Sequence, residues 1–331
     1  MVRKKGKAQS SKGKKRRFSS FIAQVKKAFL GASAIVACSI GILFLYNCFS
    51  SKSISYEEEK KPVCSVIERS SSVERKTTPK RENKSLQSSG KSQKSASLNE
   101  FPQGVEIPAL KNKCKEQIIK HEGYTVSYNS DYKIANWVAY ELTSREAISK
   151  KHDRTNKFVP DPMVKGATAK NEDYTRTGYD KGHLAPAGDM KWSAKAMRES
   201  FYFSNICPQK PGLNRGIWKD LEEQARLWAK ENRSLRVVTG PVISDDMKRL
   251  GKHRVGVPKS FYKVMCMIVD GRVEGVGFIF ENRGYDKTPL RSMMIPIDSV
   301  EKVTGIDFFP SLPDSIENFM ESRVNAEKWS F

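Results

Sequence analysis

The sequence predicts an α+β fold, with a mixed, largely antiparallel sheet flanked by helices. Two β-forming runs, 261–269 and 273–280, flank the dipeptide Asp270-Gly271, and that arrangement is the strongest short signal for a β-hairpin. Residues 215–232 instead repeat apolar side chains at helical spacing. Because strand and helix signals mix along the chain and at least one strand pair is antiparallel, a doubly wound parallel sheet is excluded.

Two further strands are expected before the hairpin. Residues 136–142 alternate apolar and polar side chains, which predicts a strand with Val138, Tyr140 and Leu142 on one face. Residues 235–240 form an apolar run that ends at a Gly-Pro breaker, which is typical of a buried strand.

Three helices are expected. The helix at 215–232 follows Asn214, a residue type that is favoured as an N-cap. Shorter helices are expected near 194–203 and 313–325. No G-x-G-x-x-G or Walker-type loop is present, which argues against a nucleotide cofactor. The apolar stripe of the first helix consists of Ile217, Trp218, Leu221, Ala225 and Trp228.

The first 50 residues differ in composition from the rest of the chain. Residues 1–27 hold 11 Lys and Arg and no acid, and residues 28–49 form an uncharged, apolar stretch of 22 residues. At about 1.5 Å per residue this stretch could cross a hydrocarbon core of about 30 Å. The basic flank favours a cytoplasmic tail at 1–27. We therefore expect a single-pass membrane anchor at 28–49, with the remainder extracytoplasmic, on the periplasmic or cell-surface side.

Two alternatives for residues 28–49 stay open. A cleaved signal peptide would have an apolar region of about 7–15 residues and a small-residue cleavage site, and this stretch is longer and lacks that end. A lipoprotein signal could use Cys38 as its lipidated residue, but the apolar residues continue beyond it. The anchor is the preferred interpretation.

Residues 50–105 are expected to form a flexible Ser/Lys-rich linker, because a segment with few apolar residues cannot offset its ordering entropy. Residues 106–331 carry the hydrophobic patterning of a folded domain. The six Cys contain no C-x-x-C pair and the four His no H-x₃₋₅-H pair, which argues against a structural zinc site.

Two segments carry residues suited to catalysis. His183 lies between Gly and Pro residues, and its near-neutral pKa makes it versatile, although a lone His is more often structural. In the second segment, 204–226, Asn214 offers a neutral oxygen ligand, and Glu222 and Arg226 lie on one helical face at i,i+4. Taken singly, Asn214 could be only a cap, and Glu222 and Arg226 only a surface ion pair.

Together the two segments resemble the DNA/RNA non-specific endonuclease family, the ββα-metal or His-Me finger nucleases. The family carries a D-R-G-H motif, which matches Asp180-Lys181-Gly182-His183 with Lys in place of Arg. Its second block, S-N-x-x-P-Q…L-N-x-G-x-W…L-E…R, matches residues 204–226 with the family's spacing, and the resemblance extends over about 130–325. It implies a ββα-metal nuclease core in a nuclease domain at 106–331.

The resemblance implies a sugar-non-specific endonuclease that hydrolyses phosphodiester bonds of DNA and RNA. His183 matches the general base that activates water, and Asn214 matches the residue that binds one catalytic Mg²⁺, for which Mn²⁺ is a possible substitute. Glu222 matches a carboxylate that holds the water shell of the metal. Arg226 matches a cation that stabilises the phosphate in the transition state.

Four further residues are assigned by the resemblance. Asn205 and Asp180 match supporting positions, and Arg154 resembles an upstream Arg that contacts phosphate, although an exposed loop Arg is an equally ordinary interpretation. Lys181 keeps the positive charge of the family's Arg but loses its bidentate geometry. This departure bears on rate or substrate preference, not on the type of reaction.

The expected partners follow from charge and resemblance. Residues 101–331 hold 37 Lys and Arg against 30 Asp and Glu, which suits salt-dependent binding of DNA and RNA through phosphates. Homodimers are common in such families, so a second copy is an expected partner, and residues 28–49 would contact membrane. The alternative function is a non-catalytic, membrane-tethered nucleic-acid-binding protein.

Overall fold

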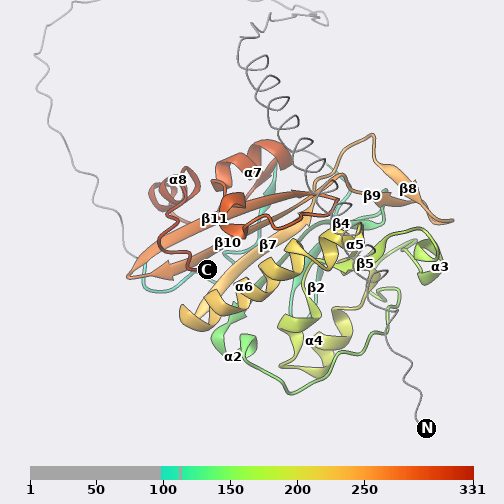
Figure 1. Cartoon of the computed structure of the whole chain (residues 1–331), viewed down its shortest axis with the longest axis horizontal. Coiled ribbons are helices and arrows are strands. Elements are labelled where there is room, and N and C mark those ends of the chain that lie inside the picture. The colour runs from blue at the N-terminus through green and yellow to red at the C-terminus, as the bar shows by residue number, and fades with distance from the viewer. Residues whose placement is uncertain (1–97, 112–113) are drawn as a thin grey trace, which may run out of the picture. The chain divides into compact units, whose positions relative to one another are not determined.

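A computed structural model describes residues 98–111 and 114–331, in which the main element is a six-stranded antiparallel sheet (Figure 1). Every pairing within this sheet is antiparallel. The predicted largely antiparallel sheet with flanking helices is therefore confirmed. In sheet order the strands are β11 (Arg272–Glu281), β10 (Ser260–Val269), β7 (Ser234–Pro241), β4 (Ile134–Thr143), β3 (Thr125–Asn129) and β2 (Gln117–Lys120).

The predicted hairpin is formed by β10 and β11. Val269 pairs with Arg272, which leaves Asp270 and Gly271 as a two-residue turn with φ values of 52° and 74°. Two positive φ values in succession are the requirement of a type I′ turn, whose twist matches that of the strands. Asp and Gly are the residue types that adopt this conformation at low cost.

A hydrophobic layer covers each face of the sheet. On one face, α6 (Ile217–Glu231) packs its buried stripe against Val138, Tyr140 and Leu142 of β4, as the alternating pattern predicts. We call this the α6 face. On the other, α7 (Ile297–Thr304) and α8 (Asp314–Glu321) pack against the alternate side chains of the same strands. We call this the α7/α8 face (Figure 1).

Two glycines of β11 set how closely α7 and α8 approach the sheet. A Cβ atom added to Gly275 would lie 2.7 Å from Ile297 Cδ1 and 2.7 Å from Met320 Cγ. One added to Gly277 would lie 2.5 Å from Val300 Cγ2. Side chains at these positions would push both helices outward, so the glycines fix α7 and α8 against the same strand.

A smaller antiparallel pair lies beside the main sheet on the α6 side. Strand β5 (Asp180–His183) pairs with β6 (Ile206–Gln209). The chain then passes through the short helix α5 (Pro211–Asn214) into α6. Because β5, β6 and α6 follow in that order, the predicted motifs lie on two paired strands and the helix after them.

The expectation that Asn214 caps α6 is wrong. Asn214 is the last residue of α5, and the N-cap of α6 is Gly216. The side chain of Asn214 instead donates a hydrogen bond to Asp180, so it is held by β5 and is not turned towards the start of α6.

The remaining elements are short. The helices expected near 194–203 and 313–325 are present but end earlier, as α4 (Ala194–Glu199) and α8. Strands β1 (Ala109–Leu110) and β12 (Ile306–Asp307) form one pair, and β8 (Lys248–Leu250) and β9 (Val255–Val257) another. The other helices are α2 (Ser144–Ala147) and α3 (Asn171–Tyr174), with 3₁₀ turns η1 (Ala187–Met190), η2 (Phe203–Asn205) and η3 (Leu290–Met293).

The tail expected at 1–27, the anchor expected at 28–49 and most of the expected linker lie outside the described residues. Among the helices of the described residues, none combines the length and apolar character that crossing a bilayer requires. The described part of the expected linker contacts the folded domain at both ends: Leu98 N donates to Gly271 O at 3.0 Å, and Val105 is fully buried on the α7/α8 face.

Candidate active site

His183 ends strand β5 and is buried between two aromatic rings. It is 6% exposed, and its ring centroid lies 4.8 Å from that of Phe201 and 5.5 Å from that of Phe158. Its Nε2 atom is buried and has no hydrogen-bond partner in the described part of the chain. Burial, and then the charge of Arg154, lower the pKa of His183 from 6.5 to about 3. The imidazole is therefore neutral near pH 7.

Two basic side chains that the sequence singled out also lie against these two rings. The Arg154 guanidinium carbon lies 5.0 Å from the centroid of Phe201, and Lys181 Nζ lies 4.2 Å from that of Phe158. Cations at this distance from a ring are attracted to its face. His183, Arg154 and Lys181, which lie in two separate segments of the sequence, are thus brought together around one pair of aromatic side chains.

Asp180, at the start of β5, orients Asn214. Its Oδ2 accepts a hydrogen bond from Asn214 Nδ2 at 2.9 Å, and both its oxygens accept from the Arg215 guanidinium at 2.7 Å. The hydrogen bonds from Arg215 hold the pKa of Asp180 below its usual value, so it stays a carboxylate. Because the amide nitrogen of Asn214 is fixed on this anion, its carbonyl oxygen points elsewhere and is available as a ligand.

The first turn of helix α6 forms a hydrogen bond with strand β5. Trp218 Nε1 donates to the backbone carbonyl of His183 at 3.4 Å. Glu222 and Arg226 follow Trp218 at intervals of four residues, so all three lie on one side of the helix. The carboxylate and the guanidinium predicted from the sequence therefore extend along α6 from the turn that contacts His183.

Arg226 is anchored by a residue that the sequence interpretation did not single out. Its Nη1 donates to Asp189 Oδ1 at 2.8 Å, and Tyr140 OH donates to Asp189 Oδ2 at 2.9 Å. Asp189 is 1% exposed. Although burial opposes the charge of Arg226, the Asp189 carboxylate raises its pKa. The structure thus pairs Arg226 with Asp189, in place of the surface pair with Glu222 that the i,i+4 spacing allowed.

A buried lysine whose charge acts on Glu222 was also missed. Lys263 of β10 is 1% exposed, its Nζ lies 4.7 Å from a Trp218 ring centroid, and no described residue accepts a hydrogen bond from it. Burial raises the pKa of Glu222 to about 7, and the positive charge of Lys263 opposes that rise. Lys263 is the single charged residue of β10. A charged side chain within an otherwise apolar strand was therefore the sequence signal that could have identified it.

Two buried amides support the strands. Asn205 Nδ2 donates to the carbonyls of Ala185 and Ser200, at 2.9 and 2.8 Å, and its Oδ1 accepts from Ala185 N at 2.9 Å. This fixes the backbone after His183. Gln209, also missed, is fully buried, and both its amide atoms lack partners among the described residues. A Cβ atom on Gly182 would collide with the Gln209 side chain, which explains the glycine before His183.

The donor set suits the magnesium ion that the resemblance implies. Mg²⁺ prefers oxygen ligands and keeps several of its waters, so it is bound through few protein groups. The carbonyl of Asn214, held in place by Asp180, and the carboxylate of Glu222 are oxygens of this kind. On these observations the residues fit Mg²⁺.

Comparison with known proteins finds relatives over the folded part of the chain. Nuclease EXOG, mitochondrial, of Danio rerio is 35% identical over 208 residues, which are 58% of this chain and 60% of that protein. Endonuclease G, mitochondrial, of Homo sapiens is 32% identical over 209 residues, 59% of this chain and 70% of that protein. The mitochondrial nuclease of Saccharomyces cerevisiae is 31% identical over 228 residues, with shares of 62% and 69%.

A solved structure shares the fold. The crystal structure titled "Crystal structure of the EndoG/EndoGI complex: Mechanism of EndoG inhibition" matches with a TM-score of 0.58 and 30% identity. The match covers 63% of this chain and 90% of that one. The antiparallel sheet with its helices is therefore the fold of that nuclease.

The relatives correct the expected location. They are named as mitochondrial nucleases, and this finding overturns the expectation of a nuclease domain on the periplasmic or cell-surface side of a membrane. That expectation is wrong. It depended on residues 28–49, which lie outside the described part of the chain.

The match to a family profile agrees with the motifs. A profile described as DNA/RNA non-specific endonuclease matches residues 102–315, which include β5, β6, α6 and every predicted site residue. The resemblance inferred from the two motifs is thereby confirmed. Since this match covers most of the chain, the chain belongs to the DNA/RNA non-specific endonuclease family.

Proposed function

We propose that the chain is a Mg²⁺-dependent endonuclease that hydrolyses phosphodiester bonds of DNA and RNA without sequence preference. The observation that carries the proposal is the neutral, buried imidazole of His183. Arg154 and Lys181 contact the same two aromatic rings as His183 does, and Trp218 of α6 donates a hydrogen bond to its backbone carbonyl. A base, phosphate-binding cations and oxygen ligands for a metal are the parts that this hydrolysis needs.

His183 is the proposed general base. A base must be unprotonated before it can accept a proton from the attacking water. Burial between Phe158 and Phe201 keeps the imidazole in that form at neutral pH. Asn205, which fixes the backbone at Ala185, holds the strand end that carries the ring.

Asn214 and Glu222 are the proposed metal-binding residues. A bound Mg²⁺ would stabilise negative charge on the phosphate and on the departing 3′ oxygen. Asp180 holds the amide nitrogen of Asn214, which leaves the carbonyl oxygen to bind the ion. Glu222 would hold metal-bound water by accepting hydrogen bonds, and Lys263 favours its ionised form.

The proposed phosphate contacts come from Arg226, Arg154 and Lys181. Arg226 uses Nη1 to bind Asp189, so its other N–H groups remain for a phosphate oxygen, to which charge-assisted hydrogen bonds are strong. Lys181 donates to Asn171 Oδ1 at 2.8 Å and offers a point charge without the fork of an Arg. None of these groups reads a base, which suits cleavage without sequence preference. The expected homodimer stays a prediction.

The test is a cleavage assay on the full-length chain. Supercoiled plasmid and a single-stranded RNA are incubated with the protein in Mg²⁺ and, separately, in EDTA. We expect nicked and linear plasmid and RNA fragments with Mg²⁺, and intact substrates with EDTA. Retained, salt-dependent DNA binding with no cleavage in Mg²⁺ or Mn²⁺ would instead support the non-catalytic nucleic-acid-binding protein.

A further inference from the structure

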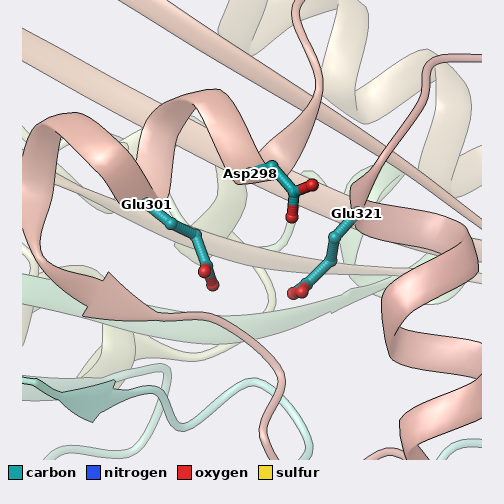
Figure 2. Close-up of side chains that lie close together, drawn as sticks. All are labelled: Asp298, Glu301 and Glu321. Carbon is teal, nitrogen blue, oxygen red and sulfur yellow. The ribbon is translucent and has the colours of Figure 1, made fainter.

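Three carboxylates meet on the α7/α8 face of the sheet. Asp298 and Glu301 lie three residues apart on α7, and Glu321 is the last residue of α8. One oxygen of each lies within 4.8 Å of the others, and Figure 2 shows the three side chains pointing toward one another between the two helices. His183, by contrast, lies on the strand pair that packs with the α6-face core.

Glu321 is the member of this cluster that most needs a partner. It is 6% exposed, and its Oε1 is buried without a hydrogen-bond partner among the described residues. A buried charge without a partner is destabilising. Its place at the C-terminus of α8, the negative end of the helix dipole, adds to that cost. An unpartnered carboxylate that points at two others indicates a missing positive ligand.

The surrounding side chains do not supply that charge. Lys111 Nζ binds Glu301 Oε2 at 2.7 Å and Asp307 Oδ1 at 3.2 Å. In residues 98–111 and 114–331, no basic side chain pairs with Asp298 or Glu321. The three converging carboxyl groups thus have Lys111 as their one basic partner among the described residues.

The two helices hold the carboxylates in place before any ligand arrives. Gly275 and Gly277 of β11 let α7 and α8 pack closely on one strand. Glu301 is also oriented by Phe308 N, which donates to its Oε1 at 2.8 Å. A site on packed helices needs little rearrangement to bind, which lowers the cost of binding.

We propose that Asp298, Glu301 and Glu321 bind one Ca²⁺ ion that links α7 to α8. Oxygen-only donors suit a hard cation, and three converging carboxylates suit Ca²⁺, which takes about six to eight oxygen ligands in a flexible geometry. Mg²⁺ keeps more of its waters and is usually bound through one or two carboxylates. The number and type of the donors therefore favour Ca²⁺. The ion stabilises the fold and takes no part in cleavage.

The test measures thermal unfolding and calorimetric Ca²⁺ binding of the full-length chain. Both are done in an Asn214→Ala background, so that the proposed catalytic metal site does not contribute. At about 100 times the dissociation constant, Ca²⁺ raises the unfolding temperature by about 5–10 °C. Glu321→Gln in this background abolishes both the shift and the heat of binding, and without Ca²⁺ it unfolds at the same or a higher temperature, because the carboxyl group that it replaces has a buried oxygen without a hydrogen-bond partner.

Asp314→Asn, which removes an exposed carboxylate from the first turn of α8 outside the cluster, is the matched control and keeps the Ca²⁺ shift. Absence of a Ca²⁺ shift, an equal shift in Glu321→Gln, or stabilisation by Mg²⁺ and not by Ca²⁺ would overturn the proposal. Glu321→Gln alone, with Asn214 intact, retains plasmid nicking, so the outcome is independent of the proposed nuclease activity.

Discussion

The two faces of the main sheet bury charge in opposite ways. On the α6 face, the buried carboxylate of Asp189 meets Arg226 at 2.8 Å, and the positive charge of Lys263 acts on Glu222. On the α7/α8 face, three carboxylates converge with Lys111 bound to one of them. The first set balances its charges within the protein, and the second depends on a cation from outside.

This difference explains how each face contributes to the molecule. Internally balanced charges keep Arg226 and Glu222 oriented before substrate binds, and preorganised groups are what catalysis by electrostatic stabilisation requires. An acidic cluster is instead stabilised by a bound cation, and this stabilisation grows with the logarithm of the cation concentration, because only the folded state brings the ligands together. Removing one charged partner on the α6 face should therefore destabilise the fold. Removing one carboxylate on the α7/α8 face should leave the fold stable.

The largest effect on stability is expected from Asp189→Ala. This change leaves the partly buried Arg226 and Tyr140 OH without their partner, and breaking a buried ion pair costs about 3–5 kcal/mol. Urea unfolding of the full-length chain measures the loss. Tyr140→Phe is the control, because it removes one hydrogen bond to the Asp189 carboxylate and keeps the ion pair, so it costs less, about 1.5–3 kcal/mol. Equal, small losses in both variants would contradict an anchoring role for Asp189.

A smaller effect is expected from Lys263→Met, measured as the pH dependence of plasmid cleavage. Burial already raises the pKa of Glu222 to about 7, and loss of the nearby positive charge raises it further. Since the carboxylate form prevails only above its pKa, the acid limb of the profile moves to higher pH. A shift of one pH unit corresponds to about tenfold less activity on that limb.

The control for Lys263 is Lys259→Met, which removes an exposed lysine that pairs with Asp246 just before β10. We expect its profile to match that of the wild type. A Lys263→Met profile that differs only in height, with the acid limb unmoved, would show that Lys263 acts through packing and not through the charge of Glu222.

Local patterns predicted the strands and helices that have strong local signals. The Asp270-Gly271 turn and the alternation in β4 depend on neighbouring residues, so the sequence showed them directly. The cap assigned to Asn214 failed because a second short helix, α5, ends at that residue. Residue preference could not distinguish the end of one helix from the start of the next.

The sequence predicted the candidate site residues that lie within the two motifs, and it did not predict their partners outside the motifs. The candidate residues of β5, β6 and α6 could be singled out because they lie within two short segments, whereas their partners come from other elements, Asp189 from the 3₁₀ turn η1 and Lys263 from β10. Asp189 is 37 residues from Arg226, and Lys263 is 41 from Glu222. The cluster of Asp298, Glu301 and Glu321 likewise depends on two helices that meet on β11. Such pairings become visible only when the sheet is assembled.

The central claim is that the imidazole of His183 takes the proton from water. The most direct measurement compares the cleavage rate of His183→Ala, with and without added imidazole, against wild type and against His152→Ala as the matched control. The claim predicts a loss of about 10²–10⁴-fold, partial recovery with imidazole, and no change in the control. A His183→Ala chain that cleaves at the wild-type rate without imidazole would contradict it.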